Sequence, residues 1–192
     1  HWTWPGREGE VTPVFVYTNY PTAELFINGK SYGKQSKNNS SLKSRYRLMW
    51  MDAVYEPGEV KVVAYNKDGK AVAEKTVRTA GKPHHIELVS NRNELIADGK
   101  DLAYVTVKVV DKDGNLCPTD SRLIHFSVKG AGKFRAVANG DPTNLEQFHL
   151  PKMHAFHGML TAIVQAGEIA GDLVLTAKAS GVKTGTVHLQ AK

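Results

Sequence analysis

Short apolar or alternating runs, each bounded by turn residues, recur along the whole chain. No stretch places apolar residues at i, i+3, i+4 and i+7 over the roughly 11 residues that indicate an amphipathic helix. The pattern therefore predicts strands throughout. We place them at residues 14–17, 24–28, 46–50, 59–65 and 71–77, and then at 86–89, 102–110, 123–128, 134–138, 159–164, 173–177 and 186–189.

Turn chemistry supports this prediction. Three pairs of turn residues lie between predicted strands: Asn28-Gly29, Asp68-Gly69 and Asp113-Gly114. Asn, Asp and Gly tolerate positive φ, so these pairs predict β-hairpins. The first hairpin is predicted to join strands at residues 24–27 and 30–32. In its first strand, the period of two directs Leu25 and Ile27 to one face and Glu24 and Phe26 to the other.

A break between two sets of strands predicts two domains. Thr79-Ala80-Gly81-Lys82-Pro83 ends the first set, and His84-His85-Ile86 begins the second. We place the domains at residues 1–82 and 83–192, and a chain of 192 residues fits two sandwiches of about 100 residues each. With 41% hydrophobic and 23% charged residues, each half can bury an ordinary core. The predicted fold class is all-β, with two β-sandwich domains in series.

The net charge of +6 does not identify an anionic partner. Residues 1–82 carry 13 Lys and Arg against 8 Asp and Glu. The densest part of this excess spans a Ser/Asn-rich loop and contains Lys30, Lys34, Lys37, Lys43, Arg45 and Arg47. Nucleic-acid binders usually add a known motif or stacking aromatics, and neither is present. We interpret the excess as a solvated basic loop, with a polyanion site as the alternative, and expect no nucleic-acid partner.

The chain offers no membrane segment. No apolar run reaches the roughly 18 residues needed to cross a bilayer, and no segment resembles a signal peptide. We therefore expect no membrane insertion. The first residues, His1-Trp2-Thr3-Trp4, are rich in aromatics and lack an initiator Met, which suggests a fragment of a larger protein. The single cysteine, Cys117, permits no internal disulfide and is interpreted as a packing residue.

Histidines gather in one segment without matching a metal site. His149, His154 and His157 are separated by five and three residues, which fits no standard zinc pattern. We interpret the segment as a polar loop and predict no metal or cofactor. Whether these histidines bind a metal stays open at this point.

Three tryptophans are candidates for a surface role. Trp50 shares a face of its predicted strand with other apolar residues, which favours the core over a sugar platform. Trp2 and Trp4 alternate with other residues, so in an extended segment both indoles project to the same side. We predict a docking strip against a part of the protein outside this chain, with burial in the chain's own sandwich as the alternative.

The first half resembles the segment that follows the catalytic barrel in family 2 glycoside hydrolases, especially bacterial β-galactosidases. The resemblance rests on Val16-Tyr17-Thr18-Asn19-Tyr20, Ala23-Glu24-Leu25-Phe26-Ile27-Asn28-Gly29-Lys30-Ser31-Tyr32-Gly33, Tyr55-Glu56-Pro57-Gly58-Glu59-Val60-Lys61 and Thr79-Ala80-Gly81. In that family these segments complete an immunoglobulin-like domain. His1-Trp2-Thr3-Trp4 also resembles the family's junction leaving the barrel.

The second half resembles the next immunoglobulin-like domain of the same enzymes. Leu95-Ile96-Ala97-Asp98-Gly99 and Val110-Asp111-Lys112-Asp113-Gly114-Asn115 also resemble bacterial Ig-like repeats of surface adhesins. Ala138-Asn139-Gly140-Asp141-Pro142-Thr143 is closer to the enzyme family alone. Asn139 and Asp141 can bond to nearby loop amides, so we interpret them as ordering the loop, with contact to sugar hydroxyls or a metal as the alternative.

The resemblance assigns no catalytic residue, because the barrel with its acid/base and nucleophile glutamates lies outside the chain. The one Asn-Glu step, Asn93-Glu94, flanks a strand edge and has no partner acid of the kind that a glycosidase needs. We therefore predict a non-catalytic accessory region of a secreted, periplasmic or extracellular, β-galactosidase-type enzyme. Its expected partner is the catalytic barrel, which it supports and positions.

The alternatives are a carbohydrate-binding module, with carbohydrate as the partner, and an adhesion-type Ig-like module. The accessory role is favoured because a sugar-binding face would expose several aromatics. Phe, Trp and Tyr make up only 8% of the residues, and most of them occupy predicted core positions.

Overall fold

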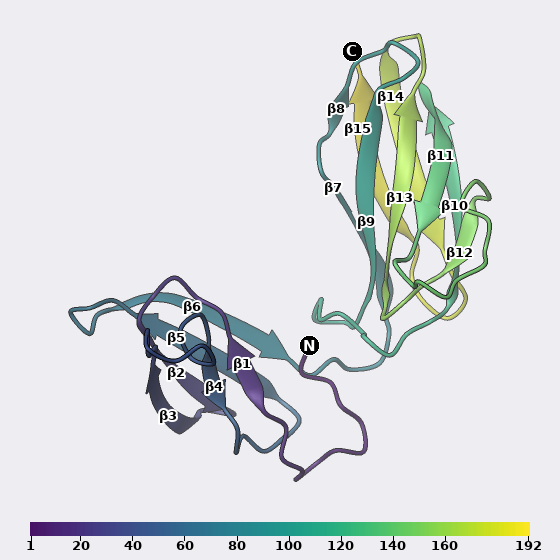
Figure 1. The fold of residues 1–192 in the computed structure, drawn as a ribbon. Coiled ribbons are helices and arrows are strands. Elements are labelled where there is room, and N and C mark those ends of the chain that lie inside the picture. The colour runs from purple at the N-terminus through teal and green to yellow at the C-terminus, as the bar shows by residue number, and fades with distance from the viewer. The chain divides into compact units, whose positions relative to one another are not determined.

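The computed structural model describes all 192 residues, His1–Lys192, and its elements are strands (Figure 1). The all-β prediction and the β-sandwich architecture are confirmed. The structure contains no helix of the length and apolarity that a membrane span requires. The chain divides into two compact units, His1–Thr79 and Ala80–Lys192, and each has its own buried apolar cluster.

The first unit combines a four-stranded antiparallel sheet with a two-stranded one. The larger sheet has the order β3-β2-β5-β6 and consists of β2 (Thr22–Ile27), β3 (Lys30–Ser36), β5 (Glu59–Tyr65) and β6 (Ala71–Arg78). The smaller sheet pairs β1 (Val14–Val16) with β4 (Leu48–Trp50). Leu48 and Trp50 of β4 pack with Leu25 of β2 in one core, so Trp50 is a core residue as predicted.

The β2–β3 hairpin follows its turn chemistry. Asn28 and Gly29 have φ values of 48° and 81°, and positive φ at both central residues suits the right-handed twist of paired strands. The Asn28 side chain also accepts a hydrogen bond from the Glu59 amide at 2.8 Å, which ties the turn to β5. Leu25 and Ile27 are buried on one face, as the alternation predicts.

The second unit packs a five-stranded sheet against a four-stranded one. The five-stranded sheet has the order β12-β10-β14-β15-β8, from β12 (Lys152–His154), β10 (Leu123–Gly130), β14 (Gly171–Lys178), β15 (Gly185–Ala191) and β8 (Glu94–Leu95). The other has the order β11-β13-β9-β7, from β11 (Gly132–Ala138), β13 (Met159–Ala166), β9 (Leu102–Val110) and β7 (His85–Ser90). The pair β15–β8 is parallel, and the other pairs are antiparallel.

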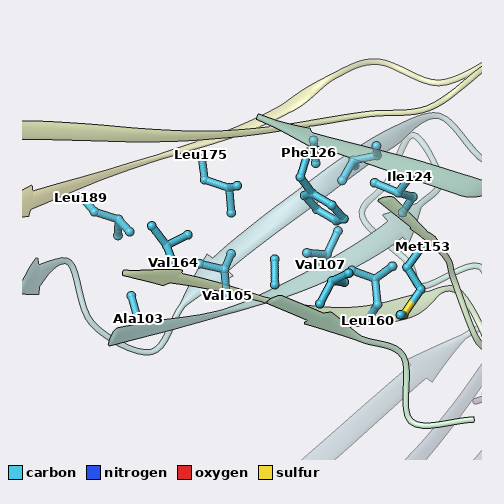
Figure 2. Packing of buried hydrophobic residues seen from close by; sticks show 14 of the residues in the cluster. Ala103, Val105, Val107, Ile124, Phe126, Met153, Leu160, Val164, Leu175 and Leu189 are labelled. Carbon is cyan, nitrogen blue, oxygen red and sulfur yellow. The ribbon is translucent and has the colours of Figure 1, made fainter. Parts of the chain in front are cut away.

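Alternate residues of the facing strands fill the second core. Figure 2 shows Leu175 and Leu189 of one sheet pointing toward Val105 and Val164 of the other, and all four are buried. Cys117 is buried in the same cluster, as the packing interpretation predicts. Burial raises the pKa of its thiol to about 11.

One predicted strand begins too early. The expected strand at residues 46–50 is β4, which starts only at Leu48, and Tyr46 is exposed. Residues before it form a local loop, in which the Arg45 amide donates to the Ser41 carbonyl and the Asn38 amide to the Ser44 carbonyl. These bonds satisfy the backbone locally and so replace a strand ladder.

Candidate docking groove and loop sites

A groove of about 550 Å³ lies in the first unit, along the open side of its sandwich. Its lining is mostly apolar and comes from three places: β1 and its flanks, the inner faces of β5 and β6, and the N-terminal segment. The lining includes Trp4, Phe15, Tyr17, Val62, Ala73 and Lys75.

The groove exists because the two-stranded sheet, β1 and β4, covers only part of the inner face of the four-stranded sheet. In the register of the larger sheet, Val62 of β5 lies between Leu25 of β2 and Lys75 of β6. Leu25 is fully buried, Val62 is half-buried and Lys75 is exposed. Burial of the side chains on the inner face therefore decreases from β2 to β6. The half-buried Val60, Val62 and Val77 form the floor of the groove.

The structure gives the two N-terminal tryptophans different surroundings. Trp2 is 3% exposed and belongs to the core, where its Nε1 donates to the Glu56 carbonyl at 3.0 Å and its ring meets Tyr55 edge-on. Trp4 is 38% exposed and stacks on His1 with 4.2 Å between ring centroids. Both line the groove, Trp2 as a buried side chain and Trp4 as an exposed one.

The expectation of two exposed indoles is therefore corrected. The segment is not a strand, because the Trp2 carbonyl accepts from the Thr79 hydroxyl and the Trp4 amide donates to the Tyr55 hydroxyl. These contacts direct the chain around Tyr55 and bury Trp2 in its own sandwich. For Trp2, burial in the chain's own sandwich therefore replaces the docking strip. Of the two tryptophans, only Trp4 keeps a large exposed surface, and its contact with a part outside the chain stays a prediction.

Cationic side chains lie over several rings of the first unit. Lys34 Nζ is 4.0 Å from the centroid of Tyr65, Lys61 Nζ is 5.5 Å from that of Phe26, and the Arg47 guanidinium is 5.5 Å from that of Phe15. Such cation–π contacts occupy one ring face each. These rings are therefore poor bare platforms for stacking a sugar.

Asn139 and Asp141 hydrogen bond within their own loop. Asn139 donates to the His154 carbonyl at 2.9 Å and accepts from the Asp141 amide at 3.0 Å. Asp141 Oδ1 accepts from the amide and the hydroxyl of Thr143, both at 2.8 Å. The hydrogen bond from the backbone amide of Thr143 is the main cause that lowers the pKa of Asp141. These bonds order the loop without a ligand.

The three histidines of this region are not brought together. His154 Nδ1 lies 3.1 Å from a carboxylate oxygen of Glu146, and His157 Nδ1 lies 3.2 Å from the Pro118 carbonyl oxygen. No group of three or more His, Cys, Asp or Glu side chains in the chain has an arrangement that could hold a metal ion.

Asp111 is a buried carboxylate whose importance the sequence did not reveal. It is 2% exposed and accepts hydrogen bonds from the amides of Gly81, Asp113 and Asn115 at 2.8 to 2.9 Å, and from the Asn115 side chain. Burial opposes its ionisation, but these bonds outweigh burial and lower its pKa to about 2. The only sequence signal is the Asp-x-Asp-Gly-Asn run at residues 111–115, which by itself predicts a hairpin turn.

Comparison with known proteins gives matches over both units. A family model described as glycoside hydrolase family 2 C-terminal domain 5 matches residues 86–188, and a model described only as a domain of unknown function matches residues 9–73. The β-galactosidase BoGH2A of Bacteroides ovatus is 40% identical, over 100% of this chain and 22% of its own length. A β-galactosidase of Thermoanaerobacter pseudethanolicus is 30% identical, over 86% of this chain and 22% of its own length.

Solved structures agree with these sequence matches. A glycosyl hydrolase family 2 member from Bacteroides cellulosilyticus superimposes with a TM-score of 0.89 and 34% identity, over 100% of this chain and 24% of that one. A β-glycosidase from Bacteroides vulgatus superimposes with a TM-score of 0.91 and 30% identity over the same shares. The chain thus spans less than a quarter of the length of these proteins.

Proposed function

Because the chain belongs to glycoside hydrolase family 2 as a C-terminal accessory region, we propose that it supports and positions the catalytic barrel of a β-galactosidase-type enzyme. The resemblance inferred from the sequence is confirmed at the level of the family. The similar proteins are more than four times longer than the region that matches this chain, so there is room in them for a catalytic part.

The observation that carries the proposal is the apolar groove with Trp4 beside it. Trp4 exposes 38% of its surface, which for a large aromatic side chain is on the order of 95 Å². Covering that area would contribute about 2 kcal/mol at ~25 cal/mol per Å². Phe15 and Tyr17 are also exposed along the groove, so a neighbouring domain would find a continuous apolar contact there.

We infer that the chain itself is non-catalytic. The carboxylate of the Asn-Glu step, Glu94, is exposed and forms an ion pair with Lys192 at the edge of the second unit. Such a surface pair provides neither a cleft nor the second carboxylate of a glycosidase.

The proposed role can be tested in the longer enzyme and in the isolated chain. Trp4→Ala should lower the melting temperature and the activity of the longer enzyme while changing the isolated chain little. Tyr46→Ala is the matched control, because Tyr46 is 67% exposed and does not line the groove. The isolated chain should not hydrolyse aryl β-galactosides. Equal effects of both substitutions, or turnover that survives repurification of the isolated chain, would contradict the proposal.

We also propose that the longer enzyme is secreted to the periplasm or the exterior, a location supported only by the family resemblance. Cell fractionation with an antibody against this chain tests it. Recovery in the cytoplasmic fraction alone would refute secretion.

A further inference from the structure

The groove of the first unit runs along strand edges and not only over a sheet face. Consecutive residues of the β1 segment, 12–18, line it, and so do consecutive residues of β6, 73–75. Neighbouring side chains of a strand point to opposite faces, so one cavity touches them in succession only where it follows the edge of that strand. The groove therefore lies beside free edges of β1 and β6.

Both strands are edge strands in the structure. β1 has β4 as its single sheet neighbour, and β6 has β5. Each leaves one row of backbone amides and carbonyls unpaired by a strand, and such a row can accept a further strand. A strand added beside β6 would only widen the larger sheet and leave its floor uncovered. A strand added beside β1 would lie over the half-buried Val62 and Val77.

We propose that an extended segment of the catalytic part of the same longer polypeptide adds to the smaller sheet as a third strand beside β1. This inference rests on the proposed function and deepens it. The added strand directs alternate apolar side chains onto the floor of the groove. It also carries an acidic side chain opposite Lys75, which lines the groove and pairs with no carboxylate of this chain.

The length of β1 favours a partner in the same polypeptide over a second copy of the chain. β1 has only three residues and follows Pro13, which has no amide to donate, and short strands and prolines are features that prevent pairing between separate molecules. A tethered segment has an effective concentration in the millimolar range. A few backbone hydrogen bonds and a small apolar contact then suffice to keep the tethered segment bound to β1. The same contacts would be too weak to hold two separate copies of the chain together.

Hydrogen exchange followed by mass spectrometry tests the added strand. Peptides covering residues 12–18 should exchange at least about tenfold more slowly in the longer enzyme than in the isolated chain. Peptides covering β3 are the internal control, because β3 is the other edge of the larger sheet and lies outside the groove. Equal exchange of residues 12–18 in both proteins would overturn the proposal. Protection that rises with the concentration of the isolated chain would also overturn it, since that result indicates self-association.

A matched pair of variants tests the position of the strand. Ala73→Arg places a large cation in the groove, and Val72→Arg places it on the neighbouring position outside the groove. Both residues are exposed, so both variants of the isolated chain should melt close to the parent. In the longer enzyme, Ala73→Arg alone should restore fast exchange of residues 12–18. No loss of protection, or equal loss with Val72→Arg, would refute the added strand.

A separate experiment tests the proposed function independently of the added strand. Removal of residues 1–192 from the longer enzyme tests support of the barrel by activity and melting temperature. If removal lowers both but residues 12–18 exchange equally fast with and without the barrel, only the added strand is refuted.

Discussion

Replacing Asp111 by Asn should destabilise the second unit strongly, although the change alters a single atom. Oδ2 of Asp111 accepts from the Gly81 amide at 2.8 Å and from the Asn115 side chain at 3.0 Å, while Oδ1 accepts from the amides of Asp113 and Asn115. An asparagine can accept at only one of these two positions. Its amide group would then face donors at the other position, with almost no access to water because the residue is 2% exposed.

The expected loss follows from the pKa of Asp111. Its hydrogen bonds lower the pKa from 3.8 to about 2, and a shift of that size corresponds to about 2 kcal/mol of stability at neutral pH. An unsatisfied buried donor in the Asn variant adds roughly 1 kcal/mol or more. For a unit of about this size, a loss of about 3 kcal/mol or more lowers the melting temperature by roughly 12 °C or more.

The pH dependence has a definite sign. The folded-state pKa is depressed, so the stabilisation is fully present above pH 3.8 and is lost as the pH falls through about 2. Urea unfolding of the parent and the Asp111→Asn variant at pH 7, 4, 3 and 2 measures the difference at each pH. We expect it to be largest at pH 7 and 4 and to shrink toward pH 2.

The control for this experiment is Asp113→Asn, which changes an exposed carboxylate in the same turn. It should cost little at any pH. The reasoning is refuted if Asp111→Asn is no more destabilising than Asp113→Asn, or if its cost is the same at pH 2 as at pH 7.

Three further substitutions or measurements test other parts of the structure. Trp2→Ala should destabilise the isolated chain by about 3 to 5 kcal/mol in urea unfolding, because Trp2 is a buried core residue, and a cost as small as that of Trp4→Ala would contradict its burial. Gly58→Ala should cost about 2 kcal/mol or more, since a Cβ there would lie 2.1 Å from Oδ1 of Asn28 and the φ of Gly58 is 134°; an unchanged urea midpoint would refute this. Cys117 should react slowly with a thiol reagent at pH 8 until the second unit unfolds, because its pKa of about 11 leaves roughly one thiolate per thousand; fast reaction in the native state would show an open core.

Strands with a clean period could be predicted from the sequence almost to the residue. The expected strands at 59–65 and 102–110 coincide with β5 and β9, because apolar and turn residues mark both ends. Two elements were missed, Glu94–Leu95 and Lys152–His154. They have two and three residues, which is too short for any period to appear, and they form only because β15 and β10 offer an edge to pair with.

The candidate site could be predicted only in part, because it depends on contacts between distant residues. Trp4 was identified from its place beside the first strand, but the burial of Trp2 depends on Tyr55, more than fifty residues away. The groove depends on how many strands enter each sheet, and no local pattern encodes that number. Asp111 was missed for the same reason, since one of its donors, Gly81, precedes β7 and meets Asp111 only because the start of β7 pairs with the end of β9.

The position of β15 sets the order in which the two units can fold on the ribosome. All strands of the first unit have been synthesised once Arg78 emerges. In the second unit, β15 lies between β14 and β8 and supplies the buried Leu189 and Ala191, so the five-stranded sheet stays split until residue 191 is free. Until then, the nascent unit exposes the edge of β14 and an open core, a state that favours aggregation. The first unit can therefore complete its sheets earlier in translation, whereas the second cannot complete its five-stranded sheet until β15 leaves the ribosome.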